Sequence, residues 1–402
     1  MFLDTCLIRN KDVVLSFLCV NCPVSPLTLS LQVMKLLLLF NLAVLVSCQP
    51  LLTEQKVIPD LSQIYDSLAK VTQQLLTYIR ETQTLSEITS IHINTNESSH
   101  KVLITTGYPW DGETIIIDLQ NDEVTCTLPA YPLQLANGAG GIIEDEIPLI
   151  CGGYKSSKYF PNCYTLTDKT WTEIGKLETG QSSMGTGNIV VNGSLLLTGG
   201  TGTGNIPLNS MVMIDSGSMV EVLKEMPNHL VGHCNVRLNS SHIMVMGGNS
   251  DDDRSTSDTL IFDLVNQEWT QGPSMKGKRE NHGCIQMLLG DQPIIWVTGG
   301  ENGARSLQTT EYLEDLDQGW QPGPDLPYKL DFHRMVASED LETIYITGGS
   351  KALENGEILQ LQCSGSTPDT CSFATLTLDF DVIRFAHIAL PVSNTLADKV
   401  CN

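Results

Sequence analysis

The sequence is poor in aromatic residues and in charge, and poorest in positive charge. Aromatic residues make up 6% of its 402 residues and charged residues 17%, against a usual charged share of about 25%. Low charge favours strand-rich cores with uncharged loops over helices with charged surfaces. Lys and Arg number 23 against 46 Asp and Glu, so the net charge is −23. A chain this acidic repels a phosphate backbone, and we expect no nucleic acid among its partners.

Long apolar runs and familiar catalytic motifs are also missing. The longest apolar run, at 36–46, has 11 residues and is too short for a bilayer, which takes about 20. Neither Gly-x-Ser-x-Gly nor His-Glu-x-x-His occurs. The glycine-rich stretch 199–204 has no helical pattern after it and no Lys-Ser or Lys-Thr pair, so it is not a phosphate-binding loop. We therefore expect no membrane span, no enzyme activity and no cofactor.

Residues 34–48 have the layout of a secretory signal peptide: a Met, a Lys, an apolar run and two small residues. We therefore expect a secreted, extracellular protein that is cleaved at the end of this segment. Residues 1–33 are interpreted as an upstream extension that need not be translated. The alternative is one long signal or a membrane anchor over 13–47, which Pro23 and Pro26 interrupt.

Eight cysteines follow the signal segment. An even number in an oxidising compartment indicates disulfides, and none of the eight is spaced Cys-x-x-Cys, which argues against a zinc ribbon. Three Asn-x-Ser sequons for N-glycosylation also follow, at Asn96, Asn192 and Asn239.

A short amphipathic helix is predicted within 49–99. Apolar residues there recur at steps of three and four, the spacing of a heptad seam: Leu61, Ile64, Leu68, Val71, Leu75 and Tyr78. The seam is under three heptads long. It is interpreted either as a helix that packs on the main domain or as a site of self-association through residues 60–85.

The rest of the chain repeats. A Gly-Gly pair closes an apolar run five times, and the first glycines are 47, 48, 52 and 49 residues apart: Gly152, Gly199, Gly247, Gly299 and Gly348. An imperfect sixth copy ends at Gly107. After each pair a second strand leads to an acidic turn, and in three copies a Trp follows the turn: Trp171, Trp269 and Trp320.

This unit resembles the kelch repeat, and the resemblance covers residues 100–392. It implies a β-propeller with one four-stranded sheet for each repeat. A unit this small cannot bury both faces of a sheet, so neighbours must stack, and a ring leaves only short edges. We predict an all-β, six-bladed kelch-type propeller, preceded by the short amphipathic helix and followed by a C-terminal tail at 393–402. The copies in blades one and three lack the Trp, so we expect these two blades to be less regular.

The C-terminal end predicts how the ring closes. Inner strands begin near a histidine, at His233, His282 and His333, and the last such pattern, 385–390 with His387, has no unit after it. The first copy lacks an inner strand. The C-terminal strand should therefore complete blade one, although 88–93 is a competing source.

Two groups of potential metal ligands are interpreted as structural. The four histidines fall at equivalent repeat positions, so the ring should spread them around its axis, and no shared metal site is expected. The acidic run Asp251–Asp253 with Asp258 could offer oxygens to Ca²⁺. A solvated acidic turn is the preferred interpretation.

The strand order predicts four disulfides. Cys151 ends one strand and Cys163 opens the next, which places them opposite each other, and Cys363 and Cys371 do the same in blade six. Cys126 and Cys401 lie where the chain ends meet and should lock the ring. Cys234 and Cys284 occupy nearly equivalent positions in adjacent blades, where they either form a cross-blade bond or are small buried apolar residues.

Charge placement selects one face of the propeller. In a four-stranded antiparallel blade, the loops from strand two to three and the connections from strand four to one share a face. These windows hold 12 Lys and Arg against 13 Asp and Glu, whereas the rest of 100–392 holds 4 against 24. Seven cations on this face are candidate binding residues: Arg254, Lys276, Lys278, Arg279, Arg305, Lys329 and Arg384. The alternative is that loops merely favour neutral turn residues.

The sequence therefore predicts a secreted, non-catalytic propeller that binds a protein, and the cations suit an acidic one. One alternative is an extracellular enzyme, oxidase-like or hydrolase-like, that uses the central pocket. Another is an intracellular ligase adaptor, which needs a BTB-type domain. The roughly 50 residues between signal and propeller cannot hold one.

Overall fold

A computed structural model of the chain describes residues 4–10, 13–19 and 98–402, apart from 111, 145, 179, 183–186, 188, 218, 251–253, 304, 351–356 and 377–383. The chain divides into two units, Met1–Thr95 and Asn96–Asn402. In the first unit, β1 (Asp4–Asn10) and β2 (Val13–Cys19) form an antiparallel hairpin, which the sequence pattern did not predict. The expected signal peptide, the helix over 60–85 and the sequon at Asn96 lie outside the described residues.

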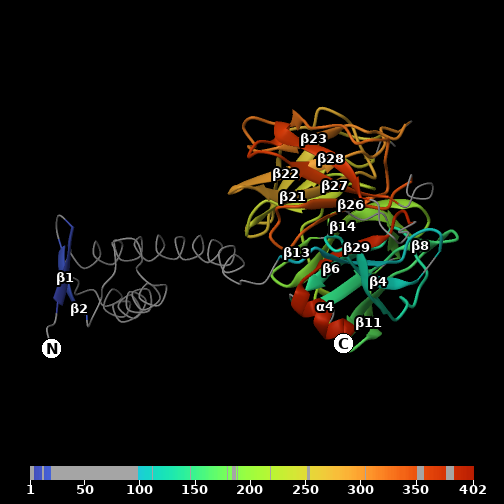
Figure 1. Cartoon of the computed structure of the whole chain (residues 1–402), viewed down its shortest axis with the longest axis horizontal. Coiled ribbons are helices and arrows are strands. Elements are labelled where there is room, and N and C mark those ends of the chain that lie inside the picture. The colour runs from blue at the N-terminus through green and yellow to red at the C-terminus, as the bar shows by residue number, and fades with distance from the viewer. Residues whose placement is uncertain are drawn as a thin grey trace, which may run out of the picture. The chain divides into compact units, whose positions relative to one another are not determined.

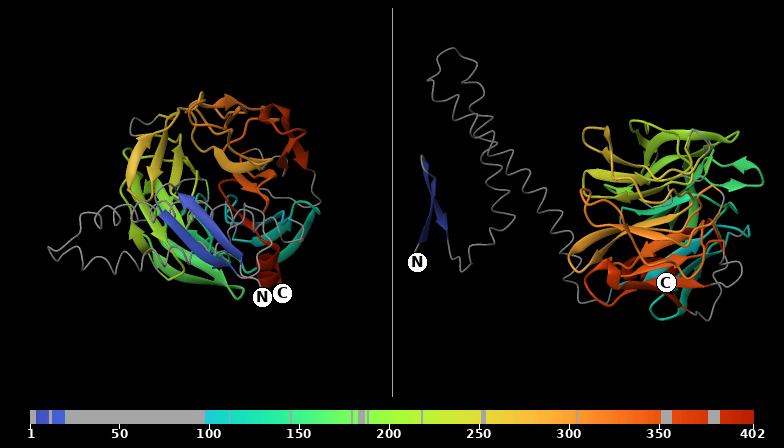
Figure 2. Two further views of the ribbon diagram at one scale, coloured as in Figure 1. Left: turned by 90° about the vertical axis from the view of Figure 1, so that its left-hand side faces the viewer. Right: turned by 90° about the horizontal axis from the view of Figure 1, so that it is seen from above.

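The second unit is a ring of six antiparallel sheets, which follow one another in sequence order around the axis (Figures 1 and 2). Blades one to three consist, from the axis outward, of β29 (Ile388–Val392), β3 (Lys101–Thr105), β4 (Thr114–Asp118) and β5 (Glu123–Leu128); of β6 (Ala139–Ile143), β7 (Ile147–Cys151), β10 (Asn162–Thr167) and β11 (Thr170–Lys176); and of β12 (Gln181–Ser182) with β13 (Val190–Val191), β14 (Ser194–Gly202), β15 (Ile206–Ile214) and β16 (Met219–Val222).

Blades four to six repeat the same order. They consist of β17 (Cys234–Arg237), β18 (His242–Met246), β19 (Thr259–Asp263) and β20 (Glu268–Gln271); of β21 (Gly283–Leu289), β22 (Gln292–Thr298), β23 (Thr310–Leu313) and β24 (Gln321–Pro322); and of β25 (Arg334–Ala337), β26 (Ile344–Thr347), β27 (Ile358–Cys363) and β28 (Cys371–Leu376). The predicted six-bladed, all-β architecture is confirmed.

The ring closes as predicted. The C-terminal strand β29 pairs antiparallel with β3, from Ile388 opposite Thr105 to Val392 opposite Lys101. The inner position of blade one is therefore filled from the C-terminus. The competing source at 88–93 lies outside the described residues. Both ends of the propeller are held in one sheet.

Blade three is irregular, as expected from its missing Trp. Two short strands, β12 and β13, both pair with β14, and the register of the β15–β16 pairing shifts between Met213 and Ile214. Blade one also lacks the Trp, and the register of its β4–β5 pairing shifts between Ile116 and Ile117, so this blade is irregular too.

The core lies between neighbouring blades. One buried cluster joins Leu103 and Ile116 of blade one to Ile150 and Leu166 of blade two, and similar clusters join the following blades. The glycine pairs permit this approach. At Gly247, which has a φ of +59°, an added Cβ would lie 2.5 Å from the carbonyl oxygen of Arg279, in the connection to blade five. Such contact and such a φ require glycine.

The tryptophans join adjacent blades through their indole N–H groups. Trp171, Trp269 and Trp320 each donate to a backbone carbonyl at the end of the preceding blade, with N···O distances of 2.9, 2.9 and 2.8 Å to Pro129, Glu225 and Pro273. A buried indole needs such an acceptor. The structural interpretation of this repeat position is confirmed.

The C-terminal segment 393–402 is not a tail. It forms α4 (Asn394–Cys401), whose N-cap Ser393 accepts a hydrogen bond from the backbone N–H of Leu396. Leu396, Ala397 and Val400 are buried in the cluster of blades one and two, so the helix covers the seam beside β5. A short 3₁₀ turn, η1 (Pro368–Thr370), precedes β28. None of the helices in the described part of the chain has the length and apolar character to cross a bilayer.

Candidate binding face

One face of the propeller carries the loops from strand two to three and the connections from strand four to one; we call it the loop face. Five of the seven predicted cations are exposed there, in loops of blades four and five and the connections that follow them: Arg254, Lys276, Lys278, Arg305 and Lys329. Within the described ranges, none of these five side chains forms an ion pair. They remain candidates for contact with a partner.

Arg279 and Arg384 correct the prediction, because both are buried. Arg279 is 1% exposed and donates to the carbonyls of Gly299 and Thr309 at 2.8 and 3.1 Å, and to the carboxylate of Glu311 at 2.7 Å. Arg384 makes the equivalent contacts in blade one, to the carbonyls of Thr106 and Glu113 and to the Glu113 carboxylate at 2.9 Å.

These two arginines hold loops together rather than face a partner. Each lies three residues before an inner-strand histidine, His282 or His387. Each guanidinium donates to backbone carbonyls at the end of strand two and the start of strand three of the blade that follows it in the ring. The Arg-x-x-His spacing that the two share is the one sequence signal of this structural role, and it occurs in only two blades.

Replacing Arg279 by Ala should lower the free energy of unfolding by about 3–5 kcal/mol, since it leaves the Glu311 carboxylate buried without its cation. Replacing its exposed neighbour Lys278 by Ala should change that free energy by less than about 0.5 kcal/mol. Urea unfolding of the two variants measures both values. Equal losses would show that Arg279 is not the structural residue of the pair.

Carboxylates lie next to the exposed cations. Glu280 accepts a hydrogen bond from Ser255 Oγ at 2.8 Å, and Glu301 accepts one from Asn281 Nδ2 at 3.2 Å. Partial burial, with Asp331 and Glu280 nearby, raises the pKa of Glu301. This part of the loop face is therefore of mixed charge, less basic than the count of cations indicated.

Six aromatic side chains form a continuous row on the loop face of blades six, one and two; we call it the aromatic row. Its ring centroids are 6.0, 5.1, 5.4, 6.4 and 5.2 Å apart in the order Phe332, Phe385, Tyr108, Trp110, Tyr154 and Tyr159. Tyr108 is 39% exposed and the other five are half-buried. Aromatic contacts of this spacing are favourable and fix ring orientation.

The sequence analysis missed the aromatic row. Its members come from four separate segments that only the closed ring brings together. One signal was available: Tyr108 and Tyr154 each follow the glycine position that ends strand two, so they occupy equivalent places in blades one and two.

A hollow of about 500 Å³ adjoins the aromatic row between blades one and two. Lys155, on the short ribbon of β8 (Tyr154–Lys155) and β9 (Lys158–Tyr159), donates to Gln134 Oε1 at 2.8 Å at its edge. A smaller hollow of about 290 Å³ lies between blades three and four. Their linings include Gly112, Pro132, Leu133 and Phe160 in the first and Asn228, Ser250, Thr256 and Asp258 in the second.

The inner-strand histidines are structural. All four have no exposed surface, and three bond through Nε2 to a threonine of the preceding blade: His233 to Thr198 at 2.7 Å, and His333 to Thr298 and His387 to Thr347 at 2.8 Å. Burial lowers the pKa of His233 to about 4 and that of His333 to about 3, and it also lowers the pKa values of His282 and His387. Across the described residues, no cluster of His, Cys, Asp and Glu is arranged to hold a metal ion.

The eight cysteines are joined in four pairs, including the cross-blade pair that the sequence left open. The Cα atoms of Cys151 and Cys163 are 4.1 Å apart, and those of Cys363 and Cys371 3.9 Å apart. The cross-blade pair, Cys234 and Cys284, is bonded with a Cα separation of 6.0 Å. Cys126 in β5 and Cys401 in α4 join the two ends of the propeller.

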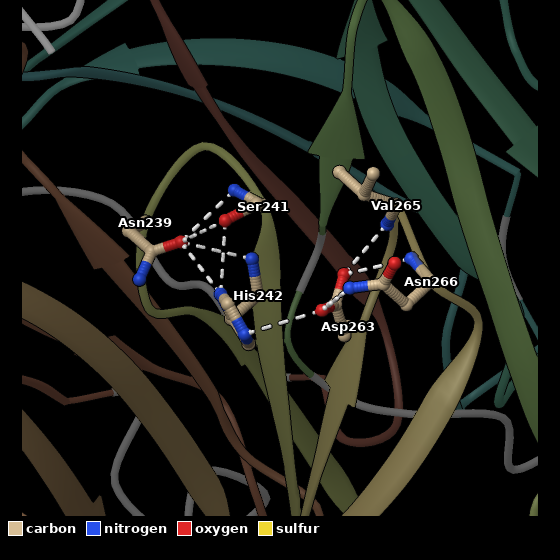
Figure 3. Close-up of polar contacts among 6 residues, drawn as sticks. All are labelled: Asn239, Ser241, His242, Asp263, Val265 and Asn266. Atoms are coloured by element: carbon tan, nitrogen blue, oxygen red, sulfur yellow. Dashed lines mark hydrogen bonds and ion pairs between the residues drawn. The ribbon is translucent and has the colours of Figure 1, made fainter. Parts of the chain in front are cut away.

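The described sequons lie on the face opposite the loop face. Asn192 and Asn239 are exposed, in the turns that lead from strand one to strand two of blades three and four. Asn239 Oδ1 accepts from the backbone N–H groups of Ser241 and His242, each at 2.9 Å, and Nδ2 points away from these contacts (Figure 3). Glycosylation at these sites stays a prediction.

The recurring acidic turn on that opposite face is also structural. Asp263 accepts hydrogen bonds from the backbone N–H groups of Val265 and Asn266 at 2.7 and 3.0 Å, and His242 lies 3.8 Å away (Figure 3). The hydrogen bonds from Asn266 and Val265 lower the pKa of Asp263. Asp118 makes the same turn in blade one. Asp therefore recurs because it caps the turn from strand three to strand four.

Comparisons with known proteins agree with this geometry. A family model described as "Kelch motif" matches residues 233–276, which form most of blade four. Two cowpox virus proteins named "Kelch repeat and BTB domain-containing protein 2", from strains Brighton Red and GRI-90 / Grishak, are each 26% identical, over 129 and 128 residues. Each match covers 32% of this chain and 22% of the viral protein, so the chain spans about a fifth of the length of these relatives.

A solved structure titled "Structure of YjhT" has the same fold. It superposes with a TM-score of 0.56 at 11% sequence identity, over 69% of this chain and 95% of that one. Identity this low speaks for the fold alone. Glycine pairs that close five of the six second strands, six blades and a kelch motif that matches blade four together identify the fold as a six-bladed kelch-type β-propeller.

Proposed function

We propose that this chain is a secreted, non-catalytic propeller that binds an acidic protein on its loop face. The observation that carries the proposal is the aromatic row. Tyr, Trp and Phe are enriched at protein interfaces, and the residues that dominate binding energy are often large aromatics. Here six of them lie in contact across three blades, next to a hollow wide enough for a side chain.

The charge distribution supports an acidic partner. The exposed cations of the loop face include Arg254, Lys276, Lys278, Arg305 and Lys329, whereas most acidic residues of the propeller lie elsewhere. Cations at the rim of an interface act mainly on the rate of encounter. The aromatic row would supply affinity, and the cations would steer the partner toward it.

Secretion is part of the proposal. It rests on the signal-peptide layout of residues 34–48 and on four disulfides in one propeller, since such bonds persist in oxidising compartments. Glycans at Asn192 and Asn239 would lie on the opposite face and leave the loop face open.

The test is capture of partners from extracellular fluid by the secreted chain, with affinities compared among variants. Tyr108→Ala with Trp110→Ala should weaken binding of a captured protein at least tenfold, because hot-spot aromatics contribute about 2 kcal/mol or more. The matched control is Val265→Ala, which removes a side chain 74% exposed on the opposite face and should leave affinity unchanged.

Charge reversal tests the steering. Lys276→Glu, Lys278→Glu and Arg305→Glu together should slow association and flatten its dependence on salt. An aromatic variant that binds as tightly as the original chain would overturn the proposed site. Turnover of a substrate by the purified protein would overturn the non-catalytic role.

A further inference from the structure

Arg334 is the one buried cation of the described propeller that has no carboxylate beside it. Its side chain is 4% exposed, comparable with Arg279 and Arg384. Those two are paired with Glu311 and Glu113. Arg334 makes a single hydrogen bond within the described ranges, from Nη1 to the carbonyl of His333 at 3.3 Å. Its Nε–H and Nη2–H groups meet no protein acceptor there, and neither nitrogen is closed off from solvent, unlike Nε of Arg279.

The neighbours of Arg334 add no negative charge. It opens β25, the inner strand of blade six, which packs beside the inner strand β29 of blade one. His333 and His387 lie close enough for their pKa values to be lowered by its charge as well as by burial, so both rings are neutral. Burial lowers the pKa of Arg334 itself to about 10, which leaves it charged at neutral pH.

The repeat frame does not require an arginine at this position. The equivalent residue, directly after the inner-strand histidine, is Cys234, Gly283 and Ile388 in blades four, five and one. An unpaired buried charge costs several kcal/mol of solvation. A carboxylate that pairs with the guanidinium would offset this cost at a side chain that keeps little contact with solvent.

We propose that the Arg334 guanidinium binds one carboxylate group at the inner wall of the propeller, between blades six and one. A guanidinium presents two parallel N–H donors that match the two oxygens of a carboxylate. The carboxylate is either that of a free small molecule or that of an Asp or Glu side chain of a docked protein. The site does not depend on binding at the loop face.

Thermal unfolding in the presence of acetate tests the proposal on the chain alone. The melting temperature of the original chain should rise by several degrees, and saturably, as acetate is added. Arg334→Met should lose this rise. The matched control is Arg237→Met, which removes the arginine of inner strand β17 whose Nε donates to Asn239 O at 3.0 Å, and it should respond to acetate as the original chain does.

Equal rises for the original chain and Arg334→Met would overturn the proposal, and so would an equal response of the original chain to chloride at the same ionic strength. Should Arg334→Met fail to fold, Arg334→Lys keeps the charge without the paired donors, and at least a fivefold weaker acetate response is expected. A blocked glutamate peptide separates the sources: binding equal to that of acetate assigns a protein side chain, and no binding assigns a free small carboxylate.

Discussion

The free energy of unfolding should fall steeply as the pH drops from 7 to 5. The inner-strand histidines carry this effect, because burial holds their pKa values below the ordinary value of 6.5, to about 4 for His233 and about 3 for His333. Between those values and 6.5 the unfolded chain binds protons that the folded chain does not. The histidines therefore favour unfolding as the pH falls through this window, and their cost disappears above about pH 7.

Each such histidine contributes about 1.4 kcal/mol per pH unit once the pH is well below 6.5. With His282 and His387 shifted in the same direction, the slope should approach several kcal/mol per pH unit. Urea unfolding between pH 7.5 and 5 measures it.

His333→Gln should flatten this slope by about one histidine's share. Trp320→Phe is the matched control, because it weakens a blade contact without removing a titrating group, and it should keep the slope. A free energy of unfolding that stays level between pH 7 and 5 would contradict burial of neutral histidines around the axis.

Loss of the Cys126–Cys401 disulfide should destabilise the propeller more than loss of any short-range pair. The bond closes a loop of 275 residues, and the chain-entropy relation gives roughly 5–6 kcal/mol for such a loop as an upper value. The unfolded chain without it is far less restrained, and α4 loses its attachment to β5.

The matched control is the pair Cys363 and Cys371, which closes a loop of 8 residues and should contribute roughly 2–3 kcal/mol. Double replacement by serine in each pair, followed by urea unfolding, gives the two losses. A loss for Cys126 and Cys401 no larger than that of the control would contradict a ring held shut at its ends.

The repeat could be predicted from the sequence because the residues with the same structural role recur at a nearly constant spacing. Glycine pairs, the Asp of the outer turn and the Trp after it recur about every 50 residues. The three Trp side chains make the same contact, and so do Asp118 and Asp263. The same regularity located the strand that closes the ring and, through strand order, the disulfide partners.

The errors arose where burial decides the role of a residue. Arg279 lies in a turn between blades, and a cation in a turn was interpreted as exposed. Its Arg-x-x-His spacing occurs in only two blades, too few to stand out as a repeat. Residues 393–402 formed a helix because Ser393 caps it and three apolar side chains find a seam to cover, and eight residues give little periodicity to detect.

Sequence patterns could reveal only the part of the aromatic row that repeats, Tyr108 and Tyr154. Phe332 and Phe385 come from connections between blades and Tyr159 from a two-strand ribbon in blade two, so no local spacing relates them. Likewise, the proposed carboxylate site rests on the absence of an Asp or Glu side chain beside Arg334 among the described residues. Only packing shows this.

Hydrogen exchange with and without a captured partner tests most directly whether the loop face is the binding site. Peptides that contain 108–110, 154–159 and 332 should gain protection on binding, followed by those with 276–278 and 305. Peptides from the opposite face, such as 239–242 and 263–268, should exchange at unchanged rates. Protection confined to the opposite face, with the aromatic row exchanging as in the free protein, would contradict the account.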